Sequence, residues 1–594
     1  PHPHPPSTHA THSLLFPTIP PTIHVHRCPP LLNSASMSRS ILTHPLIIAA
    51  TLVYLVHLCY MLHVTYHLLA DAQPLLVPRL IRNRHHLFTV DGADHQYTSF
   101  IMGIPYLAIP IVATVILCWS RKQHRPPDVP TSGGTNNLAL AISLLFWLIL
   151  HRAYAVFPFF LSTAAFEVLG WTARHGSSSY LHSALTATYA LGLLLVVQSY
   201  GEHWGLFLLP GSRTLEHIGQ LSRWSAFWPM MTLRIVSWAQ DYASAVRGDS
   251  VVRCDCPTCL AAAASRGASP FAAAPGCERA RVRAHRPLAD YQSLSLFIQY
   301  MAYAPVYWAG PIVTFNAFAA CKAQPQYHTS VGAYWLRVLG LGLVMELYLR
   351  FFHVYSLAEV ERALAERYVL HPYQGVALVF VVLQLLWTKL AVIWRFFRGW
   401  ALLDGVEAPE NMSRCIDGAE SVAQFWRSWH ASFNLWLVRY LYIPLNGRKR
   451  PWLVVPVVFA FVAIWHELNA KLYQWGVGTV LLILTERVVG TTVGRSTAFV
   501  RLRAQRPMVA LALRCLAFAV LCAAFQLTQF MGFYSPLLAR HIVGLLIAQP
   551  AWAVLWIVLL TIQALLRFAA AATIYGKDDA LPELVDPRTA KRHE

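Results

Sequence analysis

Charged residues are scarce in this chain. Of its 594 residues only 13% are Asp, Glu, Lys or Arg, whereas about a quarter of an ordinary soluble domain is charged. Hydrophobic residues make up 56%, and the mean hydropathy is +0.44. This composition excludes a soluble globular protein. It indicates an all-α polytopic membrane protein, because in lipid a helix satisfies its own backbone hydrogen bonds.

Several catalytic signatures are also missing. The stretch "HELNA" (466–470) begins like the H-E-x-x-H motif of zinc proteases, but Ala470 stands where the second His is required. We find neither a G-x-x-x-x-G-K-[ST] phosphate loop nor a G-x-S-x-G serine elbow. A metalloprotease, a P-loop nucleotidase and a serine hydrolase of the elbow type are therefore excluded.

Acidic residues are few, 28 against 47 basic ones, so the net charge is +19. The basic residues are scattered through short loops such as "RKQHR" (121–125) and "GRKR" (447–450). That distribution favours cytosolic loops near anionic lipid headgroups over nucleic-acid binding. The 20 Trp and 25 Tyr residues are typical of membrane interfaces and do not indicate a cofactor.

About eleven apolar segments are long enough to span or re-enter the membrane. They lie near residues 44–68, 99–118, 138–164, 180–199, 293–318, 333–354, 374–396, 452–466, 472–490, 508–530 and 541–568.

The chain divides by composition into six parts. Residues 1–36, rich in Pro, His, Ser and Thr, are expected to be a disordered extension or an artefact of the gene model, before a natural start at Met37. The following parts are N-terminal spans (37–245), a Cys-, Ala- and Arg-rich loop (246–288), a catalytic core (289–490), C-terminal spans (491–575) and a polar tail (576–594).

The loop at 246–288 contains a weak metal-site candidate. Cys254, Cys256, Cys259 and Cys277, with His285, have the ligand types of a tetrahedral zinc site. Their spacing matches no zinc finger, so reduced or lipidated cysteines are the favoured interpretation. No metal is expected in the catalytic site.

Two histidines are the candidates for chemistry. His466 follows fourteen apolar residues, Trp452–Trp465, and His430 lies in "FWRSWHASFNLWLVRYLYIPL" (425–445). An ionisable group at membrane depth is costly and is usually functional. Imidazole suits proton transfer near neutral pH, and burial keeps it neutral and able to act as a base. The alternative for each is a hydrogen-bonded structural histidine.

The helical period gives the 425–445 segment two faces. Trp429, Phe433, Trp436 and Tyr440 share an apolar face, and Arg427, His430 and Asn434 share a polar one.

Another segment, "YAPVYWAGPIVTFNAF" (303–318), is broken by Pro305, Gly310 and Pro311. It is predicted to be a re-entrant or kinked element lining a cavity, with a plain proline kink as the alternative.

The blocks "WRSWHASFNLWLVRYLYIPLNG" and "IWHELNAKLYQWG" resemble the membrane-bound O-acyltransferase superfamily. With "WRFFRGWALLDGVEAPENMSRC" and "YAPVYWAGPIVTFNAF", they resemble its Gup branch, which is related to the Hedgehog acyltransferases. The resemblance covers roughly residues 300–476. Asn446 departs from the usual Gly of the first block, but Asn also tolerates positive φ in a turn.

The resemblance implies a helical fold around a central acyl-transfer tunnel, with His466 in the catalytic position and His430 in the second polar position. It implies an enzyme of the endoplasmic reticulum membrane that moves an acyl chain from acyl-CoA, its co-substrate, to the sn-2 hydroxyl of lyso-glycosylphosphatidylinositol (lyso-GPI) anchors. The alternatives are a Hedgehog-type protein acyltransferase, a non-catalytic relative and a glycerol transporter.

The residues expected to contact substrate surround these two histidines. They are Asn434, Arg427, Trp426, Trp429 and Trp465.

Overall fold

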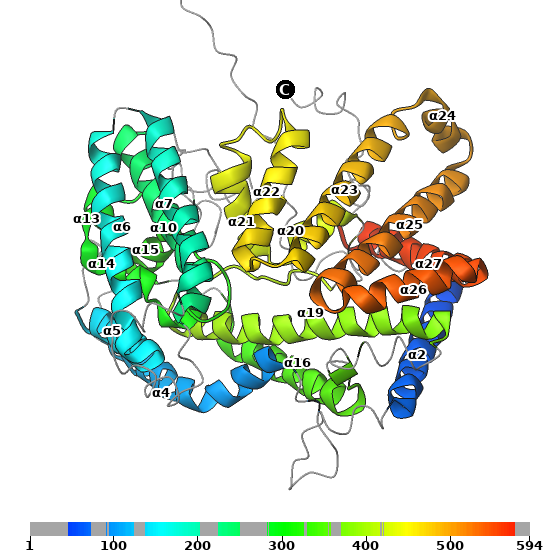
Figure 1. The fold of residues 1–594 in the computed structure, drawn as a ribbon, viewed down its shortest axis with the longest axis horizontal. Coiled ribbons are helices and arrows are strands. Elements are labelled where there is room, and N and C mark those ends of the chain that lie inside the picture. Colours follow the sequence, from blue (N-terminus) through cyan, green and yellow to red (C-terminus); the bar gives the residue numbers. More distant parts are fainter. Residues whose placement is uncertain are drawn as a thin grey trace, which may run out of the picture.

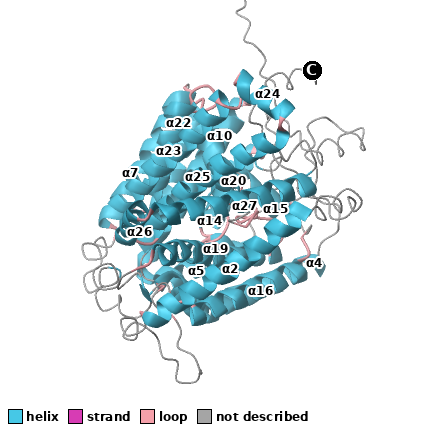
Figure 2. Cartoon of the chain, turned by 90° about the vertical axis from the view of Figure 1, so that its right-hand side faces the viewer, coloured by secondary structure: helices cyan, strands magenta, loops and turns pink. Residues whose placement is uncertain are grey.

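The computed structural model describes residues 45–72, 91, 94–123, 137–176, 178–201, 224–249, 282, 284–325, 329–353, 356–357, 361, 370–415, 419 and 421–575. Within these ranges the fold is helical and contains no strand (Figures 1 and 2), which confirms the predicted all-α class. The predictions for residues 1–36, for the tail at 576–594 and for Cys254, Cys256, Cys259 and Cys277 lie outside the described residues.

Eight helices in the described part are long and apolar enough to cross a membrane. They are α2 (Pro45–Asp71), α4 (His95–Gln123), α6 (Val156–His175), α7 (Ser179–Tyr200), α16 (Val331–Phe351), α19 (Pro372–Leu403), α25 (Pro507–Phe533) and α27 (Pro550–Tyr575). A ninth span results if α23 (Ala470–Thr492) and α24 (Thr497–Gln505), bent by 74°, count as one. Shorter apolar helices include α22 (Pro451–His466), which corresponds to the predicted segment 452–466.

Three predicted segments are interrupted in the structure. Segment 138–164 divides into α5 (Asn137–His151), the 3-10 helix η2 (Arg152–Ala155) and α6, and segment 541–568 divides into α26 (Pro536–Ala548) and α27. Segment 293–318 becomes α14 (Leu294–Met301), η4 (Ala304–Val306) and α15 (Phe315–Ala323), preceded by α13 (Leu288–Gln292). Proline explains the breaks, since it fits the first turn of a helix but disrupts an interior.

The helices form two groups joined by α19. Figure 1 shows α19 running lengthwise below the centre, with α16 along it, α6, α7 and α10 (Trp228–Arg247) upright on one side, and α23 and α25 on the other. Between these groups lie α20 (Val422–Ser428), α21 (Ala431–Leu437) and α22. The pairs α7–α10, α16–α19, α22–α23 and α23–α25 are in contact. The central helices α20, α21 and α22 thus have helices of both groups beside them.

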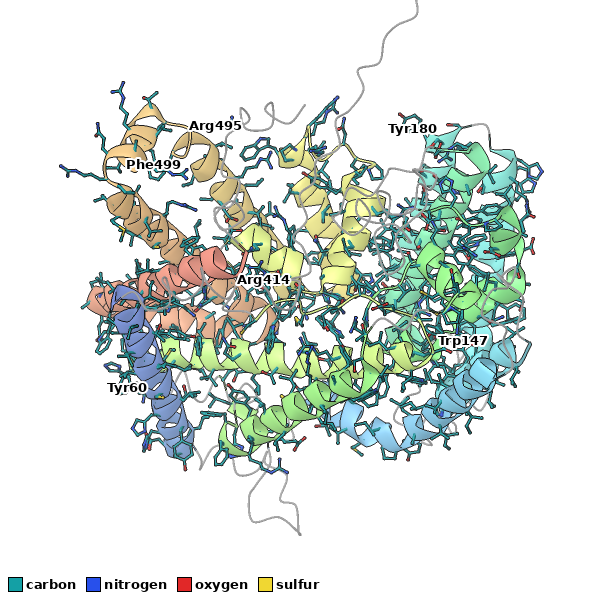
Figure 3. The ribbon with its side chains drawn as sticks, turned by 180° about the vertical axis from the view of Figure 1, so that it is seen from behind. Tyr60, Trp147, Tyr180, Arg414, Arg495 and Phe499 are labelled. Carbon is teal, nitrogen blue, oxygen red and sulfur yellow. The ribbon has the colours of Figure 1, made fainter. Side chains whose placement is uncertain are left out.

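Apolar side chains cover the outside of the bundle. Ile109 on α4 is 74% exposed, Leu336 on α16 71% and Val56 on α2 70%. Figure 3 shows Tyr60 and Tyr180 at outer edges, whereas Trp147 is 1% exposed inside α5. Helices with apolar residues on their outer faces are expected when lipid replaces water around the bundle.

The predicted single helix at 425–445 is wrong. The helix is interrupted between α20 and α21, because the backbone of His430 lies in the left-handed region, with φ 45°. After α21 comes the π-helix η6 (Val438–Tyr442). The polar face predicted for Arg427, His430 and Asn434 is therefore divided, since residues on either side of a left-handed residue do not share one helical period. Asn446 does have positive φ, 59°, as predicted for that turn.

The segment 303–318 is broken, as predicted, into η4, the non-helical residues 307–314 and the start of α15, and a buried arginine satisfies carbonyls at its beginning. Arg234 on α10 donates from Nη1 to the carbonyl oxygens of Tyr300 (2.7 Å) and Met301 (2.8 Å), and from Nη2 to that of Val306 (2.8 Å). Carbonyls freed by a break need such partners because the membrane offers none.

Candidate active site

His466 is the last residue of α22. The helix begins at Pro451, directly after the basic loop 447–450. At a rise of 1.5 Å per residue, His466 lies about 22 Å from Pro451. Its ring lies 4.8 Å from that of Trp465, 6.2 Å from Phe533 and 6.4 Å from Trp475, measured between centroids. His466 is nevertheless an exposed residue. The three aromatic rings therefore flank its imidazole at the exposed end of α22.

His430 joins α20 to α21 in a strained conformation. Its φ of 45° and ψ of 49° lie in the left-handed region, which costs a non-glycine residue about 1–2 kcal/mol. The ring is stacked on Trp394 of α19, with 4.3 Å between centroids and 16° between planes. Its carbonyl accepts the backbone N–H groups of Phe433 and Asn434, which starts α21. Packing against α19 and the helix start thus hold the unusual backbone.

The imidazole of His430 is buried, with 8% of the residue exposed, and its Nε2 atom has no hydrogen-bond partner among the described residues. Burial, with a further contribution from His466, lowers the pKa of His430 below its ordinary value. The ring is then neutral near pH 7, so one of its nitrogens can accept a hydrogen bond or proton. A buried ring nitrogen without a protein partner loses a hydrogen bond that a bound substrate can supply.

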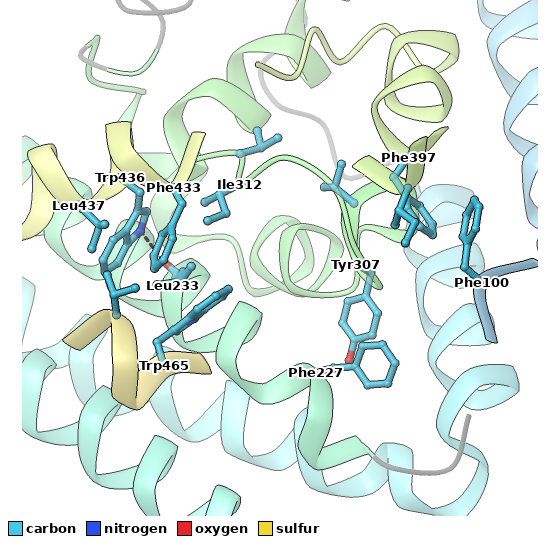
Figure 4. Packing of buried hydrophobic residues seen from close by; sticks show 14 of the residues in the cluster. Phe100, Phe227, Leu233, Tyr307, Ile312, Phe397, Phe433, Trp436, Leu437 and Trp465 are labelled. Carbon is cyan, nitrogen blue, oxygen red and sulfur yellow. Dashed lines mark hydrogen bonds between the residues drawn. The ribbon is translucent and has the colours of Figure 1, made fainter. Parts of the chain in front are cut away.

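Trp465 lies close to both histidines. Its ring centroid lies 6.3 Å from that of His430 and 4.8 Å from that of His466. Figure 4 shows Trp465 against Phe433, and their centroids are 4.5 Å apart. The indole N–H donates to the carbonyl of Pro229 at 2.8 Å, which ties the end of α22 to α10. The structure therefore brings together the two histidines that the sequence singled out.

Three loops are fastened together beside His430. Asn411 accepts, through its carbonyl oxygen, the Ala431 N–H at 3.0 Å and, through Oδ1, the Ser432 hydroxyl at 2.5 Å. The Ser432 hydroxyl in turn accepts the N–H of Ile312 at 2.8 Å. The segments 404–415 and 303–314 thus support the start of α21, and both belong to blocks that carried the family resemblance.

The five predicted substrate contacts divide into two groups. Trp465, Trp429 and Trp426 pack among the aromatic side chains near the two histidines. The ring centroids of Trp429 and Trp394 are 6.1 Å apart, and those of Trp426 and Trp475 are 5.7 Å apart. Arg427 is exposed and lies near Glu486 of α23 instead, and Asn434 is half-buried in α21. The break at His430 explains why Arg427 leaves the predicted face.

A cavity lies between α19, α20, α25 and α27. The cavity is narrow, with a volume of about 40 Å³, and it is partly open to solvent. Phenylalanines form much of its wall, and the polar lining residues are Gln384, Ser421, Gln526, Gln529 and Arg567.

Gln529 connects this cavity to His466. Its Oε1 accepts the indole N–H of Trp475 at 2.9 Å, and Trp475 meets the His466 ring edge-on. Gln529 is 4% exposed, and its Nε2 has no hydrogen-bond partner in the described part of the chain. A buried amide donor in a cavity wall suits a ligand carbonyl.

Sequence reasoning missed Trp394, Trp475, Phe533 and Gln529, which reach the site from α19, α23 and α25. Only Gln529 had a local signal, because an amide inside the apolar segment 508–530 is costly without a partner. The metal candidate remains untested: its cysteines are not described, and the described residues hold no group of three or more His, Cys, Asp or Glu that could bind a metal ion.

Comparison with known proteins identifies the family. A model described as MBOAT, membrane-bound O-acyltransferase family, matches residues 169–528, which is more than half of the chain. The chain therefore belongs to the membrane-bound O-acyltransferase family, and its predicted enzyme class, acyltransferase, is confirmed.

The relatives point to the Gup branch of the family. Membrane-bound O-acyltransferase GUP1 of Saccharomyces cerevisiae is 33% identical over 412 residues, 67% of this chain and 68% of that protein. The gup1 protein of Schizosaccharomyces pombe is 30% identical over 409 residues, 67% of this chain and 66% of that protein. Protein-cysteine N-palmitoyltransferase HHAT of Mus musculus is 27% identical over 188 residues, 30% of this chain and 37% of that protein.

Proposed function

We propose that this protein transfers a fatty acyl chain from acyl-CoA to the sn-2 hydroxyl of lyso-GPI anchors in the endoplasmic reticulum membrane. The observation that carries the proposal is the placement of two histidines around Trp465. His466 is an exposed residue at the end of α22, and His430 is buried with an unpartnered Nε2. The substrate assignment rests on the blocks shared with the Gup branch.

His466 acts as the general base in this proposal. It accepts the proton of the acceptor hydroxyl while the hydroxyl oxygen attacks the thioester carbonyl carbon. The new C–O ester bond forms, the C–S bond breaks, and the proton passes to the departing CoA thiolate. No covalent enzyme intermediate is needed. A positioned base of this kind contributes about 10²- to 10⁴-fold in rate.

His430 orients the reactants. Its unpartnered Nε2 can hydrogen-bond the acceptor or, when protonated at that atom, the developing oxyanion. Asn434 is the second candidate for this role. The stacking on Trp394 fixes the His430 ring before substrate arrives, which is what preorganised stabilisation of a transition state requires.

The cavity beside α25 suits the donor. Its apolar wall matches an aliphatic chain in chemistry, and the amides of Gln384, Gln526 and Gln529 match the amide-bearing arm of a CoA thioester. Because the volume is only about 40 Å³, the lining side chains move apart when the donor enters. The link from Gln529 through Trp475 to His466 leads from this cavity to the proposed base.

The basic loop 447–450 is proposed to face the cytosol, where Arg and Lys suit the phosphates of acyl-CoA. Arg448, Lys449 and Arg450 are all exposed at the start of α22, at the end opposite His466. The acceptor lipid then arrives from the membrane or the lumenal side. Glycosylation-site mapping checks this orientation, and a lumenal position for residues 446–451 would overturn it.

The test of function replaces His466 with Ala. GPI anchors from cells carrying only this variant should accumulate lyso forms in mass spectrometry, and the purified variant should lose acyl transfer while still binding acyl-CoA. His175→Ala is the matched control, because His175 is also an exposed histidine at the end of an apolar helix. An active His466→Ala enzyme would refute the assignment.

A second candidate acceptor is a protein amine. It is favoured by the similarity to the mouse protein, whose name describes palmitoyl transfer to cysteine nitrogen. Labelled acyl-CoA should be offered with lyso-GPI in one reaction and with a peptide bearing an N-terminal cysteine in another. Label in the lipid supports the first proposal, and label in the peptide alone would replace it with the second.

A further inference from the structure

The carbonyl groups at the end of α22 have an unexpected partner. The last carbonyls of a helix lack partners within the helix. In α22 the Ala463 oxygen accepts the Glu467 N–H at 3.2 Å, and the next two, of Ile464 and Trp465, accept from the side-chain nitrogen of Gln198 at 3.1 and 3.4 Å. Gln198 lies in α7, 266 and 267 positions earlier in the sequence.

Gln198 is a costly residue at its position. It lies near the end of α7, which is long and apolar enough to span the membrane, and it follows a Val197 that is fully buried. A side-chain amide at membrane depth is expensive unless its polar atoms are bonded. Packing of α7 alone would be served by an apolar side chain, so the amide points to a specific role.

The amide can bond these carbonyls in only one orientation, because its nitrogen donates and its oxygen does not. Two bonds then hold the residue before His466: Gln198 binds the Trp465 carbonyl, and the Trp465 indole binds Pro229 of α10. The backbone that carries His466 is thereby fixed to both α7 and α10.

We infer that Gln198 is a positioning residue for His466. It acts through the last turn of α22 and sets where the imidazole lies relative to His430 and the donor. The inference rests on the proposed role of His466 as base. A displacement of about 1 Å in a reacting group can cost about 100-fold in rate. Loss of the hydrogen bonds from Gln198 to α22 should therefore reduce turnover without removing the substrate sites.

The first test is Gln198→Met, which keeps the length of the side chain and removes the donor. The kcat of the purified enzyme should fall about 10- to 100-fold, while the KM for acyl-CoA changes less than about twofold. The matched control is Tyr189→Phe, which removes another bond from α7 to a backbone carbonyl, that of Leu161 at 2.7 Å. This control should keep the wild-type kcat.

The second test is Gln198→Glu, which gives a readout that a merely structural role would not move. A carboxylate cannot donate to a carbonyl, whereas a protonated carboxylic acid can donate once. The kcat of Gln198→Glu, divided by that of the wild type at the same pH, should therefore rise as the pH falls. This variant also serves if Gln198→Met does not fold.

The outcomes separate the two proposals. Wild-type kcat in Gln198→Met, or a pH-independent ratio for Gln198→Glu, together with an inactive His466→Ala enzyme, would overturn the positioning role alone. An active His466→Ala enzyme would overturn the base assignment and the positioning role with it.

Discussion

Replacement of Arg234 by Met should be among the most destabilising single changes in this protein. Arg234 is 4% exposed, and its guanidinium bonds three carbonyls at 2.7–2.8 Å, while Tyr300 and Tyr307 place their rings 5.7 and 5.8 Å from its central carbon. Met fills much of the volume but leaves the carbonyls of Met301 and Val306 without this donor, whereas that of Tyr300 still accepts the Tyr303 N–H at 3.4 Å.

The magnitude follows from the two carbonyls that lose this donor. Each buried acceptor left unsatisfied costs about 1–3 kcal/mol, which gives about 2–6 kcal/mol for two. The variant no longer buries a charge, and that offsets part of the loss. We expect a net destabilisation of about 2–4 kcal/mol, against less than about 0.5 kcal/mol for an ordinary surface change.

Thermal unfolding of the detergent-purified protein, followed by the loss of the monodisperse peak in size-exclusion chromatography, measures this effect. Arg174→Met, at the exposed end of α6, is the control. Arg234→Lys should fall between Met and wild type, because an ammonium keeps the charge but lacks the planar fork. An unfolding temperature for Arg234→Met equal to that of the control would refute the account of segment 303–314.

Two further predictions concern the same region and the donor cavity. Gly310→Ala should lower stability by about 1–2 kcal/mol, since Gly310 has a φ of 113° and an added Cβ would lie 2.8 Å from Cβ of Phe397; wild-type unfolding temperature for this variant would contradict that. Gln529→Leu should raise the KM for acyl-CoA about 5- to 20-fold by removing a buried donor from the cavity wall, and saturation kinetics with an unchanged KM would dissociate Gln529 from donor binding.

The sequence identified which residues are the catalytic candidates, but it predicted their spatial arrangement less well. His430 and His466 were singled out by chemistry and by their blocks, and both rings do lie close to Trp465, at 6.3 and 4.8 Å. The helix predicted through 425–445 is wrong where extended Trp429 and left-handed His430 interrupt it, and again at the π-helix η6. Helical periodicity assumes that every residue adopts the same φ and ψ, so it cannot reveal a single left-handed residue held by packing against Trp394.

Contacts between distant segments were not predictable from one sequence. Gln198 and Arg234 each stand in a helix whose local pattern gives no hint of the carbonyls that they bond, in α22 and in 300–306. The sequence did show Gln529 as an amide in an apolar segment, but it did not show the hydrogen bond between Gln529 and Trp475.

The sequence by itself determined the environment of the protein, its family and its candidate reactive groups. It has too few charged residues for a water-soluble protein and apolar segments long enough for a bilayer, and its two histidines lie in blocks typical of the family. What only the tertiary structure decided was the position of those groups. Backbone carbonyls freed at helix ends and breaks must find donors inside the bundle, and the donors that they find, Gln198 and Arg234, come from helices that only the fold brings near.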